Sequence, residues 1–256
     1  AIYLWQQSVP EPTVHIALPE ALRDTIAGPV VGFADEKNTF GWLGIPFAAP
    51  PVDKLRWAAP KLPESLQENR EAVAFKDACV QLWGTLAGTT GEVGEVVGSE
   101  DCLYLNVWAP RNNSDVDSIG LPVMLWIHGG GNTIGTANTY SGHSLAGGEN
   151  VVLITINYRL GLLGWMSHPA LRGEGRSASD ASGNYGNLDM IAALEWVQKN
   201  IAFFGWDPDN VTIFGESAGG RNVYSLMASL PAKGLFHKAI AQSGSTGTTP
   251  LWRAEN

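Results

Sequence analysis

The sequence predicts a single α/β domain, because its composition suits a large core and buried strands alternate with a helix. It has 256 residues, of which 45% are apolar. Residues 123–127 and 151–156 are apolar on both faces, as in central strands that are covered on both sides. In residues 188–201, apolar side chains recur every three or four positions, which predicts a helix lying across the sheet.

Strand signals also occur earlier in the chain. Residues 25–33 and 41–48 are predicted to be short strands joined by a polar turn, which makes them a β-hairpin. Residues 103–108 alternate between apolar and polar side chains, so we expect a strand that is buried on one face only.

The C-terminal part of the chain continues the alternation. Residues 211–214 are predicted to be a short buried strand, and residues 218–230 a helix that Pro231 ends. A last strand is expected at residues 239–242, with little in this sequence that could cover it or pair with it.

Composition and charge exclude several classes of protein. The net charge of -9 disfavours nucleic acid as a partner, since phosphate-binding surfaces depend on clustered Lys and Arg. No apolar run approaches the roughly 20 residues that a membrane-spanning helix needs. No metal-ligand cluster and no phosphate-binding loop is apparent, so neither a metal nor a cofactor is expected. Asn112 and Asn210 each begin a glycosylation sequon, but neither compels glycosylation.

The cysteines bear on the compartment. Cys79 and Cys102 could be two buried thiols. A disulfide is favoured, because closing the polar, Gly-rich loop between them would contribute about 3 kcal/mol. Residues 1–5 have neither an initiator Met nor a signal-like apolar stretch, so a signal peptide is either absent or already removed. The favoured disulfide implies an oxidising compartment, so we expect removal and a secreted or periplasmic protein.

Two glycine-containing motifs suggest a serine nucleophile. Gly215-Glu216-Ser217-Ala218-Gly219 lies between a predicted strand and a predicted helix, which is the context that a nucleophile elbow requires. His128-Gly129-Gly130-Gly131 directly follows another buried strand, and its backbone N–H groups could bind an oxyanion together with that of Ala218. Either motif alone could be an ordinary glycine turn, but the combination favours acyl transfer.

Segments along most of the chain, from about residue 25 to 245, resemble the type-B carboxylesterase, or cholinesterase-like, family of α/β-hydrolases. They occur in the order that the family has. They are Phe40-Gly41-Trp42-Leu43-Gly44, Glu100-Asp101-Cys102-Leu103-Tyr104-Leu105, Asn157-Tyr158-Arg159-Leu160-Gly161, Gly183-Asn184-Tyr185-Gly186-Asn187-Leu188-Asp189, Asp207-Pro208-Asp209-Asn210-Val211 and Ala241-Gln242-Ser243-Gly244-Ser245, together with the two motifs above.

The resemblance implies an α/β-hydrolase fold, with a mostly parallel central sheet and helices on both faces, incomplete in this chain. It implies that Ser217 is the nucleophile and that a small-molecule ester is the substrate. The residues implied around Ser217 are Gly130, Gly131 and Ala218 as oxyanion-hole donors, with Glu216 and Ser243 in supporting positions behind them. It also implies a Cys79–Cys102 disulfide and internal ion pairs between Arg56 and Glu100 and between Arg159 and Asp189.

Some positions depart from the family pattern. Asn132 follows the triple glycine where the family usually has an aromatic residue, and Asp53 replaces a glycine, so the shape of the pocket is uncertain. The cation-stacking Trp of cholinesterases has no counterpart near Glu92, which disfavours choline esters. Trp83 is expected to pack the loop that the cysteines enclose.

A catalytic base is missing from the pattern. Ser217 needs a histidine that an acid orients, and in this fold both follow the serine. Only His237 does so, in a segment that leads into a strand, while His128, His15, His143 and His168 are expected to be structural or at the surface. We therefore expect residues 1–256 to be the N-terminal half of one domain. The acid and the histidine would lie in a C-terminal half, either a separate chain or a region that this sequence lacks.

The leading hypothesis is thus a carboxylic-ester hydrolase that forms an acyl-Ser217 intermediate and releases it to water. An acyltransferase or amidase would use the same groups and differ only in the acceptor or the leaving group. A non-catalytic, cholinesterase-like binding module is the alternative from another class, but such proteins typically lack the serine.

Overall fold

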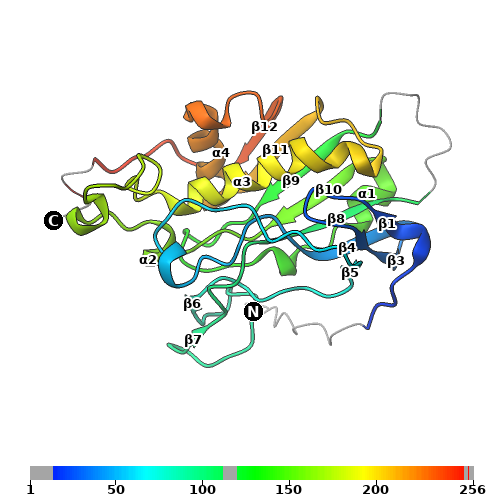
Figure 1. Cartoon of the computed structure of the whole chain (residues 1–256), viewed down its shortest axis with the longest axis horizontal. Coiled ribbons are helices and arrows are strands. Elements are labelled where there is room, and N and C mark those ends of the chain that lie inside the picture. Colours follow the sequence, from blue (N-terminus) through cyan, green and yellow to red (C-terminus); the bar gives the residue numbers. More distant parts are fainter. Residues whose placement is uncertain (1–13, 112–119, 251–252, 254–256) are drawn as a thin grey trace, which may run out of the picture.

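A seven-stranded mixed sheet runs through the centre of the molecule in this computed structural model, which describes residues 14–111, 120–250 and 253 (Figure 1). Its strand order is β12-β11-β9-β10-β8-β4-β3. The strands are β3 (Phe33–Asp35), β4 (Thr39–Pro46), β8 (Tyr104–Pro110), β9 (Val123–Ile127), β10 (Val152–Ile156), β11 (Val211–Glu216) and β12 (Lys238–Gln242). Residues 1–5 and the sequon at Asn112 lie outside the described residues.

The direction of pairing divides the sheet. β10, β9, β11 and β12 pair in parallel, whereas β3, β4, β8 and β10 pair antiparallel. Two small sheets lie apart from it: β1 (Leu22–Arg23), β2 (Val30–Val31) and β5 (Arg70–Glu71) form one, and β6 (Gln81–Leu82) with β7 (Val96–Val97) the other. Since parallel strands end at the same edge, loops after β9 and β11 can meet there.

Four α-helices and six 3-10 helices complete the described part of the chain. The α-helices are α1 (His143–Glu149), α2 (Gly161–Gly164), α3 (Tyr185–Asn200) and α4 (Ala218–Ala228). The 3-10 helices are η1 (Pro19–Ala21), η2 (Asp53–Leu55), η3 (Ala137–Thr139), η4 (Pro169–Arg172), η5 (Ile201–Phe204) and η6 (Leu230–Ala232). None of the helices within the described ranges is long and apolar enough to cross a membrane.

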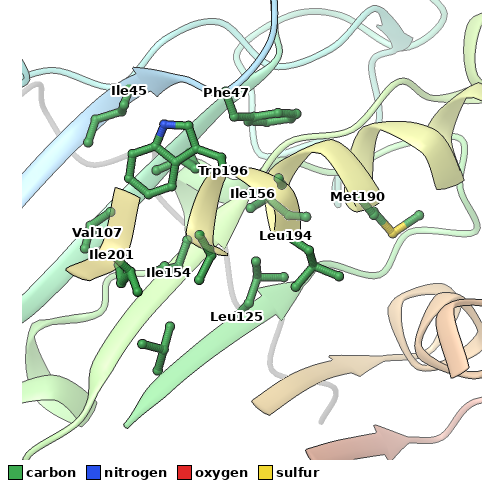
Figure 2. Close-up of a cluster of buried hydrophobic side chains, with 14 of the residues drawn as sticks. Ile45, Phe47, Val107, Leu125, Ile154, Ile156, Met190, Leu194, Trp196 and Ile201 are labelled. Atoms are coloured by element: carbon green, nitrogen blue, oxygen red, sulfur yellow. The ribbon is translucent and has the colours of Figure 1, made fainter. Parts of the chain in front are cut away.

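Helices cover both faces of the sheet, as expected. α3 lies across one face, where Met190, Leu194 and Trp196 pack over the sheet residues Leu125 and Ile154 (Figure 2). Burying each large apolar side chain of this kind stabilises the fold by about 1.5–3 kcal/mol.

The opposite face has its own smaller core. Trp108 of β8 packs there with Phe33, Leu43 and Ala146, the last of which belongs to α1. Val107, the neighbour of Trp108 in the strand, belongs to the core beneath α3. Successive side chains of β8 thus point to opposite, buried faces.

Two predicted strands need correction. Residues 25–33 do not form one strand, because Gly28 has φ +108 and its N–H donates to the Thr25 carbonyl at 3.0 Å, which closes a turn. The hairpin forms later, between β3 and β4.

The expectation that β8 is buried on one face only is also wrong, because β8 is buried on both faces. The polar Asn106 can be buried because it accepts a hydrogen bond from the Gly44 N–H and donates one to Thr155 Oγ1.

The strand expected at residues 239–242 is confirmed as β12, at one edge of the sheet. Its side chains are mostly exposed, and Ile240 retains 44% of its accessible surface. β12 pairs in parallel with β11 along its whole length, with Gln242 opposite Glu216. This pairing places the residues that follow β12 beside the turn that follows β11.

The two predicted ion pairs differ in burial. Arg159 and Asp189 are 3% and 0% exposed, and Asp189 accepts hydrogen bonds from Nε, Nη2 and the backbone N–H of Arg159. Arg56 and Glu100 also form a two-pronged pair, but their side chains are 39% and 23% exposed. Both expected ion pairs therefore form, but only the first is fully buried, and the second is part-exposed.

Replacing Asp189 with Asn should lower the free energy of unfolding by about 3–5 kcal/mol, because it leaves the buried Arg159 guanidinium without a counter-charge. Glu100→Gln is the matched control, and its effect should be much smaller because water solvates the exposed Arg56. Urea unfolding of both variants measures the difference. Equal losses would contradict this account of the two pairs.

Candidate active site

The ends of β9 and β11 bring the two glycine motifs together. The strands are parallel neighbours, and their register places Gly215 opposite Ile127. The residues that follow, His128-Gly129 after β9 and Glu216-Ser217 after β11, therefore lie side by side at the same edge. A Cβ atom on Gly129 would lie 3.4 Å from Cβ of Ser217.

Ser217 occupies a strained turn between β11 and α4. Its φ of 56° and ψ of -116° are rare for a residue with a side chain, and such conformations cost about 1–3 kcal/mol. The Ser217 N–H donates to the Gln242 carbonyl at 2.9 Å, and its own carbonyl accepts from the Arg221 N–H at 3.0 Å. Its side chain is exposed, and the hydroxyl forms no hydrogen bond with the described residues. The turn thus presents Oγ outward.

The flanking glycines of the serine motif allow this turn. A Cβ on Gly219 would lie 2.0 Å from the Ile127 carbonyl oxygen, and one on Gly215 would lie 2.6 Å from the same atom. Both contacts are far shorter than van der Waals separation. Any larger residue would push α4 away from the end of β9.

The loop after β9 offers backbone donors. Gly130 has φ +96 and Gly131 φ +66, which glycine adopts at little cost, and the Gly130 carbonyl accepts from the N–H groups of Thr133 and Ile134. Within the described residues, the N–H groups of Gly130, Gly131 and Ala218 donate to no protein acceptor. Three backbone donors of the predicted oxyanion hole are thus unpaired.

His128 is a buried residue that directly precedes the glycines of this loop. Its side chain is buried, stacks on the Tyr158 ring at 4.3 Å and places Nδ1 2.8 Å from the Gly129 carbonyl oxygen. Because a carbonyl only accepts, Nδ1 holds the proton of the neutral imidazole. Burial lowers the pKa of His128 to about 4. The prediction that this residue is structural agrees with its position.

The stability of the protein should fall between pH 6.5 and 4 because of His128. The unfolded chain has a His pKa near 6.5, so in this window it binds a proton that the folded protein does not bind. The loss should be on the order of 3 kcal/mol and should level off below pH 4. His128→Asn keeps a donor near the Nδ1 position but does not titrate. Urea unfolding against pH should give a shallower slope for this variant, and an unchanged slope would contradict the argument.

The loop closed by the disulfide (residues 79–102, the disulfide loop) holds the far end of the loop after β9 (residues 128–135, here called the oxyanion loop after its predicted role). Cys79 and Cys102 form a disulfide, so the alternative of two free thiols is wrong. Gln81, which is buried, donates Nε2 to the carbonyl oxygens of Cys79 and Gly135 and accepts the Gly135 N–H at Oε1, 2.7 Å away. Trp83 donates to the Thr89 carbonyl within the enclosed loop, as expected of a packing residue.

Glu216 and Ser243 lie at the edges of the site. An oxygen of the Glu216 carboxylate lies 3.1 Å from where a Cβ on Gly129 would be, so this side chain borders the oxyanion loop. Ser243 has φ +52 and directly follows Gln242, whose carbonyl holds the Ser217 N–H. Both residues are exposed in the described structure. Their predicted supporting roles remain predictions.

All five histidines lie in the described part of the chain, and no hydrogen bond there joins an imidazole to Ser217. His237 accepts the Val211 N–H at Nδ1, 3.2 Å away, at the opposite end of β11 from Ser217. His15 stacks on Phe33, His143 begins α1 and lies near two carboxylates, and His168 caps η4. Each of the five is thus engaged with groups other than Ser217.

Sequence reasoning missed two polar residues that hold the oxyanion loop, Gln81 and Asn222. Asn222 bonds to Asn132, 90 positions away, and Gln81 bonds to Gly135, 54 positions away. Neither residue belongs to the motifs of the site. The one signal was Asn132, whose departure from the family pattern marked the loop as unusual.

Comparison with known proteins assigns the chain to a family. Residues 11–253 match the model of the carboxylesterase family, so the chain belongs to that family. It is 45% identical over 218 residues to a medium-chain fatty acyl-CoA hydrolase precursor of Anas platyrhynchos, which covers 83% of this chain and 37% of that protein. It is 44% identical over 253 residues to liver carboxylesterase 1 of Oryctolagus cuniculus, which covers 93% of this chain and 42% of that protein.

Solved structures agree with this assignment. A PNB esterase superposes with a TM-score of 0.81 at 42% identity, covering 92% of this chain and 46% of that one. A carboxylesterase of Geobacillus stearothermophilus gives 0.73 at 39% identity, covering 86% of this chain and 43% of that one. The α/β-hydrolase fold is therefore confirmed. The chain spans less than half the length of the relatives and structures that it matches here.

Proposed function

We propose that this chain provides the nucleophile and the oxyanion hole of a serine carboxylesterase. One observation carries the proposal: Ser217 stands on a strained turn beside Gly130 and Gly131, and among the described residues neither its hydroxyl nor the N–H groups of these glycines have a protein partner. Backbone donors aimed at a developing negative charge are a main source of catalysis in acyl transfer. Membership of the carboxylesterase family supports the same reaction.

The reaction follows from these groups in two halves. Ser217 Oγ attacks the ester carbonyl carbon, its proton passes to a base, and the carbonyl oxygen becomes an oxyanion that accepts hydrogen bonds from Gly130, Gly131 and Ala218. Collapse of this intermediate breaks the bond to the alkoxy oxygen, which takes the proton and leaves as the alcohol. Water then attacks acyl-Ser217 by the same route and releases the carboxylic acid.

The base and its orienting acid are proposed to come from a C-terminal half of the domain, joined to this half or present as a separate chain. The support is geometric, because the five histidines described here are engaged elsewhere or lie away from Ser217. A secreted or periplasmic location is part of the same proposal. The Cys79–Cys102 disulfide supports it, since such bonds persist in oxidising compartments.

Among the rival functions, a non-catalytic binding module is disfavoured. The relatives described above carry the names of hydrolases and esterases, and Ser217 is present on its strained turn. An acyltransferase or amidase shares the acyl-enzyme step. Product analysis separates an acyltransferase, because a hydrolase yields the free acid even when other nucleophiles are present. Comparing an ester with the amide of the same acid separates an amidase, because the two substrates differ only in the leaving group.

Ser217→Ala in the intact protein should remove p-nitrophenyl ester hydrolysis by a factor of about 10⁴ or more, because the covalent route is lost. A fluorophosphonate should label the Ser217 peptide of the unmodified protein, as read by mass spectrometry. Ser225→Ala is the matched control on the same helix, where Ser225 Oγ donates to the Arg221 carbonyl, and it should keep both activity and label. An active protein without a label at Ser217 would sink the proposal.

A further inference from the structure

Two asparagine side chains tie the oxyanion loop to the nucleophile helix. Asn132 Nδ2 donates to Asn222 Oδ1 at 3.1 Å, and Asn222 Nδ2 donates to Asn132 Oδ1 at 2.9 Å. Asn132 directly follows Gly131, and Asn222 lies in α4, which begins directly after Ser217. The pair therefore joins the two segments that contribute backbone donors to opposite sides of the site.

The pair is held in place from several directions. Asn222 is 2% exposed, and a buried amide that loses its partner is costly, so Asn222 requires Asn132. Asn132 has φ +60, a conformation that Asn tolerates better than most residues, and its carbonyl accepts the Gly161 N–H at 2.7 Å. Tyr158 Oη donates to the His128 carbonyl at 2.6 Å and lies 3.5 Å from Asn132 Oδ1.

The glycine-rich loop after β9 needs a contact that restrains it. It contains three successive glycines, residues that lose the most backbone freedom on ordering and resist bending least. Gln81 fixes the loop at Gly135, beyond the donors, and β9 fixes it at Ile127, before them. The Asn132–Asn222 pair adds a contact next to Gly131 that is anchored on α4, so it bears directly on the distance between the loop donors and the N–H of Ala218.

We propose that Asn132 and Asn222 are a positioning pair that sets the geometry of the oxyanion hole. The inference rests on the proposed function of the site. Neither amide touches the reacting atoms. They act through the backbone of Gly130, Gly131 and Ala218, whose donors stabilise an oxyanion only if all three converge on it. Loosening the pair should therefore cost transition-state stabilisation more than substrate binding.

The test compares Asn132→Gly, Asn222→Ala and the double variant in the intact enzyme. Glycine keeps the positive φ of position 132, and alanine suits the helix at position 222, so each removes an amide with little backbone strain. Active sites are counted by fluorophosphonate titration, so that kcat refers to folded enzyme. Thermal unfolding identifies any variant that does not fold. If Asn222→Ala does not fold, Asn222→Ser replaces it.

Each single variant should lower kcat for a p-nitrophenyl ester by about 10- to 100-fold, with little change in KM. The kcat of the double variant should be no lower than that of the less active single variant, because the two amides act as one unit. The affinity for a trifluoromethyl ketone, which binds the serine as an oxyanion adduct, should fall in proportion to kcat/KM.

Asn200→Ala is the matched control. Asn200 is also a buried amide with two hydrogen bonds, to the Ile26 N–H and the Trp196 carbonyl, but it does not contact the oxyanion loop. This variant should lose thermal stability and keep its kcat per active site. Unchanged kcat in both single variants, or an equal loss in Asn200→Ala, would overturn the inference. Absence of labelling at Ser217 in the unmodified enzyme would overturn the proposed function instead.

Discussion

The parallel pairing of β9 with β11 is the constraint on which the rest of the site depends. Its register sets Gly215 opposite Ile127, so the glycine loop and the serine turn leave the sheet at the same level. Gly215 and Gly219 then let the start of α4 approach the end of β9 to within contact of the Ile127 carbonyl. Without this approach the proposed donors on the loop and on α4 would lie farther apart.

The surroundings of the site keep that arrangement rigid. The large core under α3 and the smaller core around Trp108 fix the sheet, and the buried Arg159–Asp189 pair links the segment after β10 to α3. Gln81 joins the disulfide loop to the oxyanion loop, so the disulfide supports the site as well as the fold. The strain at Ser217 can persist because its neighbours leave the turn no alternative.

Much of this was predictable from the sequence where the determinants are local. The motifs at residues 128–131 and 215–219 each occupy a single turn after a buried strand, and the structure brings them together. Contacts between distant residues were not predictable, because the sequence of one segment does not specify which distant segment it contacts. The Asn132–Asn222 pair and the hydrogen bonds of Gln81 are contacts of this kind. Burial was misjudged at β8, where the polar Asn106 finds partners on two neighbouring strands, and at the Arg56–Glu100 pair, which forms but is only part-buried.

The most direct measurement is mass spectrometry of the intact enzyme, quenched by acid during steady-state hydrolysis of a p-nitrophenyl ester and then digested. The account predicts that the peptide containing Ser217 gains the mass of the acyl group and loses it when the substrate is exhausted. Two results would contradict the account during steady turnover. One is an acyl group on a residue other than Ser217. The other is the absence of any acylated peptide in a sample quenched during the initial burst of nitrophenol.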